Sequence, residues 1–340
     1  MSRALIVRLP NPLGDVVAAT PLLAWLRRRG EGRRVLAAGR APALELLDGL
    51  EDLDGLLEIP AGAGVRAEAR ILRGAGAQEI LLLPNSWSSA LAAHRAGIPV
   101  RAGRGRHGRG LLLTKTLPRI RRAARMDLLY LELAGALGLP LPPREAAPAT
   151  RLAVTAEGRT RAEARLRRHG FAEAGLLAVS PGAAFGPSKV YPVELLARAV
   201  ARVVEKRAWV PVLLGSPAEA PLLRRLDEAL QAEGVRQRLP THEEPAGIAE
   251  LKALLERSRV LLGADAGPRH IAAALGVPQV VLFGPTHPGW SSFRTERLLS
   301  LRRGDVSCSP CHKAVCPLDH RCMTRIPPEE VAFAVLEAGS

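Results

Sequence analysis

The sequence predicts an α/β protein of two domains, each a doubly wound parallel sheet with helices on both faces. Short apolar runs alternate with amphipathic helical stretches along the whole chain, a pattern typical of parallel sheets covered by helices. The 340 residues suffice for two domains of ordinary size. Leu137–Thr150, which is rich in proline and lacks a sustained period, predicts a linker between them.

Seven apolar runs are expected to form buried strands, each followed by a turn rich in Gly, Pro, Asn or Ser. The linker divides an N-terminal domain, 1–150, from a C-terminal domain, 151–326. A last helix within 327–340 opens with Pro-Pro-Glu-Glu, a favourable first turn, and could pack back on the N-terminal domain. The expected strands are Ala4–Val7, Arg34–Ala38, Glu79–Leu83, Leu176–Ser180, Val210–Leu214, Val260–Gly263 and Gln279–Phe283.

The composition favours a cytoplasmic protein without a transmembrane segment. No apolar run approaches the roughly 18 residues that a membrane-spanning helix needs. Arg3, Arg8 and Asp15 interrupt the first apolar run, which therefore does not fit a signal peptide. Aromatic residues make up only 3% of the chain, so the core is expected to consist of Leu, Val and Ala.

The formal net charge is +15, from 48 basic and 33 acidic residues. A compositional bias towards arginine explains it most simply, whereas an anionic partner such as phosphate, nucleic acid or a membrane surface is the functional alternative. One stretch has basic residues but no Asp or Glu, which predicts a patch that meets an anion. No aromatic residue interleaves it, which disfavours single-stranded nucleic acid. Its cations are Arg95, Arg101, Arg104, Arg106, Arg109, Lys115, Arg119, Arg121, Arg122 and Arg125.

A carboxylate stands where the first strand gives way to a helix. Asp15 follows the turn Asn11–Gly14, and ligands of open α/β sheets bind beyond the carboxyl ends of the strands. Asp15 is therefore a candidate catalytic base. Alternatively, it is only an acid in the first helical turn, attracted by the helix dipole. In both cases, the positive helix start is expected to keep the pKa of Asp15 low.

The strongest local signal is Gly263–Thr286, a strand, a tight loop, a helix and a second strand. Pro268 begins the helix and Gly276 ends it, the asymmetry expected of helix ends. Gly267 permits close approach of a ligand, and the helix start suits a phosphate. His270 could add a donor. The alternative is a plain βαβ unit in which Asp265 caps the helix.

Two further strand ends carry charged residues. Lys189 lies in the glycine-rich loop Ser180–Val190 and is one of only five lysines in the chain, which favours a selected point charge. Glu219 follows Val210–Leu214, where a carboxylate can accept hydrogen bonds from ribose hydroxyls. It can equally serve as a first-turn helix acid.

Four cysteines lie close together near the C-terminus and nowhere else: Cys308, Cys311, Cys316 and Cys322. Their spacing resembles a compact zinc knuckle. Clustered thiols in a cytosolic chain more often bind metal than form disulfides. A structural zinc ion, one or two disulfides and free thiols all remain open alternatives.

These segments resemble glycosyltransferase family 9, the lipopolysaccharide heptosyltransferases. The opening IVRLPNPLGDVVAATPLL and the Gly263–Thr286 block match the family signature. Four other segments are similar to its second branch, the heptosyltransferases II: Leu83–Ser86, Ala96–Pro99, Pro181–Lys189 and Cys308–Cys311. The matches follow the family's order over nearly the whole chain.

The resemblance implies a GT-B architecture, in which two Rossmann-like domains face a cleft. It implies an inverting, metal-independent transfer of L-glycero-D-manno-heptose from ADP-heptose to the inner core of lipopolysaccharide. The C-terminal domain would hold the nucleotide sugar. The N-terminal domain would hold an anionic lipid A-core acceptor at the cytoplasmic face of the inner membrane. No cofactor, metal ion or nucleic acid is implied.

The resemblance also assigns residues. Asp15 matches the catalytic base, and Lys189 matches the lysine at the donor phosphates. The family usually has Ser or Thr at the position of Ala266. A related transferase that uses another nucleotide sugar is therefore an alternative, and a non-catalytic, basic nucleic-acid-binding protein is an alternative of a different class. The expected donor-binding residues are Gly14, Glu219, Asp265, Ala266, Gly267, Pro268 and His270.

Overall fold

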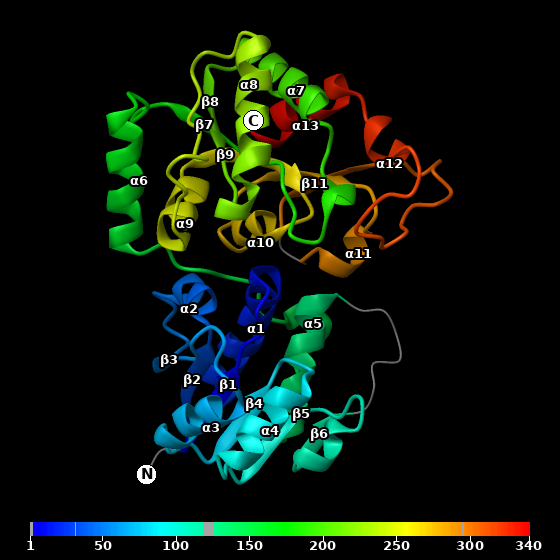
Figure 1. The fold of residues 1–340 in the computed structure, drawn as a ribbon. Helices are drawn as coiled ribbons and strands as arrows, with labels where there is room; N and C mark the ends of the chain where they lie inside the picture. Colours follow the sequence, from blue (N-terminus) through cyan, green and yellow to red (C-terminus); the bar gives the residue numbers. More distant parts are fainter. Residues whose placement is uncertain (1–2, 31, 118–124, 294–295) are drawn as a thin grey trace. The chain divides into compact units, whose positions relative to one another are not determined.

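The computed structural model describes residues 3–30, 32–117, 125–293 and 296–340. The chain forms two compact units, Met1–Ala153 and Val154–Ser340 (Figure 1). The division follows Ala153, close to the boundary that the proline-rich segment predicts. No helix in the described part of the chain is long and apolar enough to cross a membrane.

The first unit contains a parallel sheet with the strand order β3-β2-β1-β4-β5-β6. The chain runs outward from β1 through β2 to β3 and then returns to β4 on the other side of β1. This reversal creates a topological switch point between β1 and β4, where ligands of open α/β sheets bind. The strands are β1 (Ala4–Arg8), β2 (Arg34–Gly39), β3 (Gly55–Glu58), β4 (Glu79–Leu82), β5 (Val100–Arg104) and β6 (Lys115–Leu117).

Helices connect these strands and cover the sheet. Helix α1 is buried from Val16 to Leu26, because it packs on α2, α5 and β2. Ser86 caps α4 by accepting a hydrogen bond from the Ser89 amide, as expected of serine at a helix start. The α-helices are α1 (Leu13–Arg29), α2 (Ala41–Leu47), α3 (Val65–Gly74), α4 (Trp87–Arg95) and α5 (Met126–Leu131); 3₁₀-helices span Arg109–Leu112, Glu132–Leu137 and Arg144–Ala146.

The second unit contains a parallel sheet with the order β11-β10-β9-β7-β8. Here the switch point lies between β7 and β9, because β8 extends the sheet on one side and β10 and β11 extend it on the other. The loops that follow β7 and β9 therefore emerge beside each other. The strands are β7 (Gly175–Ser180), β8 (Trp209–Leu213), β9 (Ser258–Ala264), β10 (Gln279–Phe283) and β11 (Leu298–Arg302).

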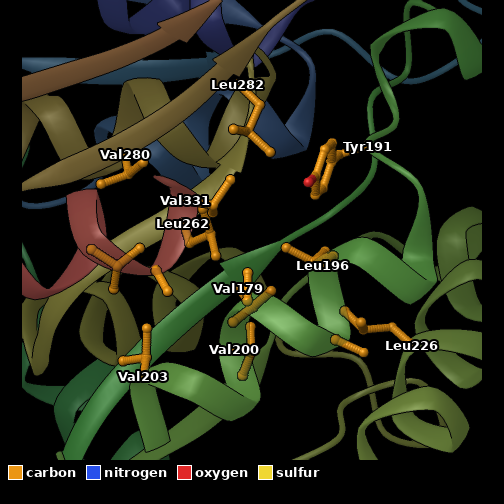
Figure 2. Packing of buried hydrophobic residues seen from close by; sticks show 14 of the residues in the cluster. Val179, Tyr191, Leu196, Val200, Val203, Leu226, Leu262, Val280, Leu282 and Val331 are labelled. Atoms are coloured by element: carbon orange, nitrogen blue, oxygen red, sulfur yellow. The ribbon is translucent and has the colours of Figure 1, made fainter. Parts of the chain in front are cut away.

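Aliphatic side chains fill the space between this sheet and the helices on one face. Figure 2 shows Val179, Leu262 and Leu282 of the sheet near Val200 of α7 and Val331 of α13, and all five are buried in one cluster. The helices of the unit are α6 (Ala156–Arg168), α7 (Val193–Lys206), α8 (Ala220–Ala232), α9 (Ile248–Glu256), α10 (Gly267–Ala274), α11 (Pro288–Ser291), α12 (Arg321–Thr324) and α13 (Pro328–Ala338); 3₁₀-helices span Pro187–Lys189 and Pro217–Glu219.

The fold class and all seven predicted strands are confirmed, with ends that differ by at most two residues. The sequence missed β3, β5, β6 and β11. Three of these are edge strands, and their side chains are partly exposed, so they lack the continuous apolar run that marks a buried parallel strand.

Two expectations about the ends of the domains need correction. The segment expected to be a linker packs on the first unit, where Leu139 and Ala147 are buried and the indole Nε1 of Trp25 donates to the Pro140 carbonyl at 2.8 Å. Helix α13 belongs to the second unit and packs on α7 and on the sheet strands beside it, because its apolar face completes that core.

Candidate functional site

Asp15 lies in the first turn of α1, just beyond the carboxyl end of β1. This position is at the switch point of the first sheet. Helix α5, which carries Tyr130, packs along α1, and Tyr130 contributes to the pKa of Asp15. Gly14 precedes Asp15 in the same turn. The sequence did not single out Tyr130, because α5 lies far from α1 along the chain.

Burial raises the pKa of Asp15 to about 6, and the hydrogen bond from Tyr130 opposes this shift. The sequence-based expectation of a low pKa is therefore wrong. The loss of hydration around the carboxylate outweighs the favourable helix dipole at this position. The higher pKa makes Asp15 a stronger base that is still ionised at neutral pH.

In the second unit, the loops after β7 and β9 meet through Lys189 and Asp265. The Lys189 ammonium donates to the Asp265 carbonyl at 2.6 Å and to its carboxylate Oδ2 at 3.0 Å. It also lies 5.1 Å from the centre of the Phe185 ring. The lysine side chain is 11% exposed, so its charge is held in a fixed place at the switch point.

The Asp265 carboxylate is the centre of a hydrogen-bond network. Besides Lys189, it accepts from Arg269 Nε at 3.0 Å, Thr286 Oγ1 at 2.8 Å and Ser291 Oγ at 2.9 Å. Burial alone would raise the pKa of Asp265, but the charges of Arg269 and Lys189 lower it well below its usual range. The carboxylate therefore joins three loop regions rather than capping α10, whose N-cap is Ala266.

The sequence did not identify Arg269, which is fully buried. Its guanidinium donates to Asp265, to Glu296 Oε2 at 3.0 Å and to the Ser291 carbonyl. A buried arginine one helical turn after an aspartate could have been a signal, since i,i+4 pairs of opposite charge face each other on a helix. Glu296 and Ser291, which follow β10 in the chain, could be recognised as partners of Arg269 only from the folded structure.

The start of α10 offers an incomplete set of free amides. Pro268 has no N–H, so the amide donors of the first turn come from Gly267 and Arg269. Ala266 supplies no side-chain cap. His270 is buried against Phe293, with ring centres 5.2 Å apart, and its Nδ1 has no hydrogen-bond partner among the described residues. Burial and the charge of Arg269 lower the pKa of His270 well below its usual value, so the imidazole is neutral.

Glu219 is the first-turn helix acid that the sequence allowed, and its contact with ribose hydroxyls stays a prediction. Its Oε2 accepts from the Ser216 amide at 2.8 Å and from the Ser216 hydroxyl at 2.7 Å, in a capping box. Its Oε1 lies against Gly182, where an added Cβ would stand 1.9 Å away. Because Gly182 has no side chain, the Glu219 carboxylate can lie against the loop that follows β7.

Most described cations of the basic stretch serve the fold. Arg109 is fully buried, and it donates to the carbonyls of Arg104, Pro84 and Ser86. Arg104 pairs with Glu132 at 2.8 Å. The prediction that these two arginines contribute to an anion-binding patch is therefore wrong, because a side chain enclosed by backbone carbonyls cannot meet an external anion. Arg95 and Lys115 are exposed; Arg119, Arg121 and Arg122 lie outside the described residues.

The segment that contains the four cysteines, Cys308–Cys322, forms hydrogen bonds with the loop that carries Lys189. His320 Nε2 lies 2.7 Å from the Ser188 carbonyl, while the Ser188 hydroxyl donates to the Lys313 carbonyl at 2.6 Å. The four cysteines line one pocket and carry free thiols. Within the described ranges, no three His, Cys, Asp or Glu side chains are arranged to hold a metal ion.

Comparisons with known proteins agree with this architecture. The sequence model of glycosyltransferase family 9 (heptosyltransferase) matches residues 65–321. The chain is 26% identical to lipopolysaccharide heptosyltransferase 2 of Escherichia coli K12, over 88% of this chain and 90% of that protein. It is 32% identical to lipopolysaccharide heptosyltransferase 1 of Pseudomonas aeruginosa, in a match that spans only 40% of either chain.

A solved structure shares the fold over the full length. It is that of E. coli ADP-heptose LPS heptosyltransferase II, with a TM-score of 0.81, 22% identity and coverage of 100% of this chain and 98% of that chain. Each unit has the parallel α/β organisation of a GT-B enzyme. Because the family model covers most of the chain, this protein belongs to glycosyltransferase family 9, the heptosyltransferases.

Proposed function

We propose that this protein transfers L-glycero-D-manno-heptose from ADP-heptose to the inner core of lipopolysaccharide, as a cytoplasmic heptosyltransferase of the second type. The observation that carries the proposal is the fixed Lys189 ammonium beside the start of α10 at the switch point of the second sheet. The sequence similarity to lipopolysaccharide heptosyltransferase 2 of E. coli, which spans most of both chains, supports the choice of substrates.

The donor diphosphate would lie between Lys189 and the start of α10. The ammonium is held by Asp265, and the amides of Gly267 and Arg269 add the positive end of the helix dipole. These groups would stabilise the negative charge that grows on the leaving ADP, so the reaction is proposed to need no metal ion. Glu219 would accept hydrogen bonds from the ribose hydroxyls with Oε1.

Asp15 would act as the general base in a single inverting displacement. It would take the proton from the acceptor hydroxyl, whose oxygen electrons form the new bond to the anomeric carbon. The bond from that carbon to the diphosphate oxygen breaks at the same time, and its electron pair leaves with ADP. This role requires that the Asp15 carboxylate reaches the acceptor hydroxyl while the donor sugar is bound.

The acceptor would be an anionic lipid A-core at the inner-membrane face. The exposed cations Arg95 and Lys115 of the first unit would attract its phosphates and carboxylates from solution. Association with the membrane surface would then be peripheral and dependent on salt.

The proposed function predicts the outcome of a donor screen. With a lipid A-core acceptor, the protein is expected to release ADP from ADP-heptose much faster than UDP or GDP from other nucleotide sugars, measured by coupled detection of the nucleotide. Faster turnover of another nucleotide sugar would favour the related transferase that Ala266 allows. Thermal stabilisation by oligonucleotides but not by ADP would favour the nucleic-acid-binding alternative.

Lys189→Met is expected to raise the KM for ADP-heptose about a hundredfold, because it removes a charge-assisted contact to the diphosphate. Asp265 keeps its other donors, so the fold should survive. The measurement is steady-state kinetics with varied donor. Lys206→Met, which removes an exposed lysine at the end of α7, is the matched control. An unchanged donor KM in Lys189→Met would contradict the proposed phosphate contact.

A further inference from the structure

The part of the first unit that contains α3 and α4 exposes positive charge without exposing a carboxylate. In the segment 59–117, which the structure describes throughout, the only acids are Glu68 and Glu79, and both are buried. Glu68 pairs with Arg8 at 2.8 Å. Glu79 pairs with Arg33 at 2.6 Å. No exposed acid of this segment therefore offsets the charge of its exposed arginines.

Helix α3 presents three of these arginines on one side. Arg66, Arg70 and Arg73 are all exposed, and their spacing of four and three residues places them on the same face of a helix. The opposite face of α3 is apolar, and its Ala69 and Leu72 are buried in the core between the helices and the sheet. The three arginines thus lie on the side of α3 that faces away from the sheet.

The positive charge continues onto α4. Helices α3 and α4 pack against each other, as Figure 1 shows. The Arg73 guanidinium donates to the carbonyl of Arg95, the last residue of α4, and the Arg95 side chain is itself exposed. We call Arg66, Arg70, Arg73 and Arg95 the basic face.

Two large apolar side chains are exposed beside one loop of the same segment. Trp87 at the start of α4 is 48% exposed, and Leu111 is 89% exposed. The Trp87 indole is fixed, because its Nε1 donates to the His107 carbonyl at 2.8 Å. Gly108 lies between the two: a Cβ added there would stand 3.3 Å from Trp87 Cζ2, and the Leu111 amide donates to the Gly108 carbonyl at 3.3 Å.

We propose that this side of the first unit binds the surface of an anionic phospholipid bilayer. The basic face lies on the head groups, and Trp87 and Leu111 enter the boundary between head groups and acyl chains. Cations beside exposed apolar side chains are the combination by which proteins bind such surfaces without spanning them, and tryptophan favours this boundary. The inference rests on the proposed function, because a lipid-linked acceptor is what brings the enzyme to a membrane.

The exposed leucine favours a bilayer over a nucleic acid as the partner. Both partners carry phosphates that attract arginines, and an exposed indole could also stack on a base. An aliphatic side chain that projects into solvent gains little from a phosphate backbone, whereas entry into lipid removes it from water. Only the bilayer therefore uses both Leu111 and the basic face.

Cosedimentation of the whole protein with lipid vesicles tests the proposal. The protein should bind vesicles of phosphatidylglycerol and phosphatidylcholine at low salt, and binding should weaken as salt is added. Vesicles of phosphatidylcholine alone should bind it poorly. The combined variant Arg66→Gln, Arg70→Gln and Arg73→Gln should bind the anionic vesicles about a hundredfold more weakly, because each cation near such a surface contributes about fivefold in affinity.

A control with the same loss of charge distinguishes a surface from net charge. Arg224, Arg236 and Arg259 are exposed arginines of the second unit, and their combined replacement by Gln should leave vesicle binding within about twofold of wild type. If the two triple variants bind anionic vesicles equally, the basic face is overturned as the contact, whether both are weakened or neither is.

Leu111→Ser tests the apolar part of the surface. Because Leu111 is almost fully exposed, the substitution should not change the melting temperature, but it should weaken vesicle binding about tenfold. Val315 of the second unit is also well exposed, at 66%, so Val315→Ser is the matched control and should bind like wild type. Vesicle binding of Leu111→Ser that equals that of Val315→Ser would contradict insertion into the bilayer.

These measurements use neither donor nor acceptor, so they separate this inference from the proposed function. If the donor screen fails but the first triple variant alone loses vesicle binding, only the proposed function is wrong. If the donor screen succeeds but both triple variants bind vesicles alike, only the membrane surface is wrong. Binding of an oligonucleotide through Arg66, Arg70 and Arg73, without binding of anionic vesicles, would overturn the bilayer as the partner.

Discussion

Asp15→Asn is expected to lower kcat for heptose transfer by at least about a thousandfold, in line with the loss of a general base. The substitution keeps the shape of the side chain at the carboxyl end of β1 and removes its ability to take a proton. Binding of ADP should stay within about twofold of wild type, because the proposed donor contacts lie in the second unit. Steady-state turnover and calorimetric titration with ADP measure the two quantities.

Glu157→Gln is the matched control for this variant. Glu157 is also a first-turn helix acid, but it lies on α6, is exposed and pairs with Arg161. It should turn over like wild type. Wild-type turnover by Asp15→Asn would instead reduce Asp15 to an ordinary acid at a helix start.

The raised pKa of Asp15 also gives this variant a predicted effect on stability. The native pKa is about 6 against an unperturbed 3.8, so the folded state binds the proton more tightly than the unfolded state. The charged carboxylate therefore costs stability above about pH 6, and the cost disappears as the pH falls towards 4. Asp15→Asn should be more stable than wild type by about 2–3 kcal/mol near pH 8, with no advantage near pH 4.

Arg269→Met is expected to reduce the free energy of unfolding by about 4 kcal/mol, because it leaves the buried Glu296 carboxylate without its charged partner and removes one of the two charged partners of Asp265. Arg269 lies between Asp265 and Glu296, whose side chains are 5% and 3% exposed. Methionine fills much of the volume but cannot donate a hydrogen bond. Urea unfolding followed by circular dichroism measures the change.

Arg159→Met is the control that tests whether the effect of removing an arginine on the free energy of unfolding depends on burial of its ion pair. Arg159 makes two hydrogen bonds of 2.8 Å to Glu256, but both side chains are well exposed. Exposed ion pairs contribute little to stability, so this variant should unfold almost like wild type. An equally small effect of Arg269→Met would show that the Asp265 network is dispensable for folding.

The network has a pH dependence of its own. The pKa of Asp265 lies below its usual range in the folded protein, so its contribution to stability is complete above the unfolded value and is lost as the pH falls below it. In Arg269→Met, the pKa of Asp265 should rise, and the acid dependence of unfolding should shrink. Unfolding curves recorded from neutral to acidic pH check this sign.

The sequence by itself determined the architecture and the places where function was to be sought. The seven buried strands have continuous apolar runs, which are a local property of the chain and are recognisable without a structure. The turns after β1, β7 and β9 hold Asp15, Lys189 and Asp265, and the rule for ligand sites in open α/β sheets pointed to them.

Only the tertiary structure decided what surrounds these groups. Tyr130 affects the pKa of Asp15 from a helix that packs on α1, and Thr286 and Ser291 donate to Asp265 from beyond β10. Arg109 is a structural residue because the fold surrounds its guanidinium with carbonyl groups. Burial and pairing depend on residues far apart in the chain, and they set the energies of charged groups. The position of each charge was therefore readable from the sequence, whereas its pKa and its partners were not.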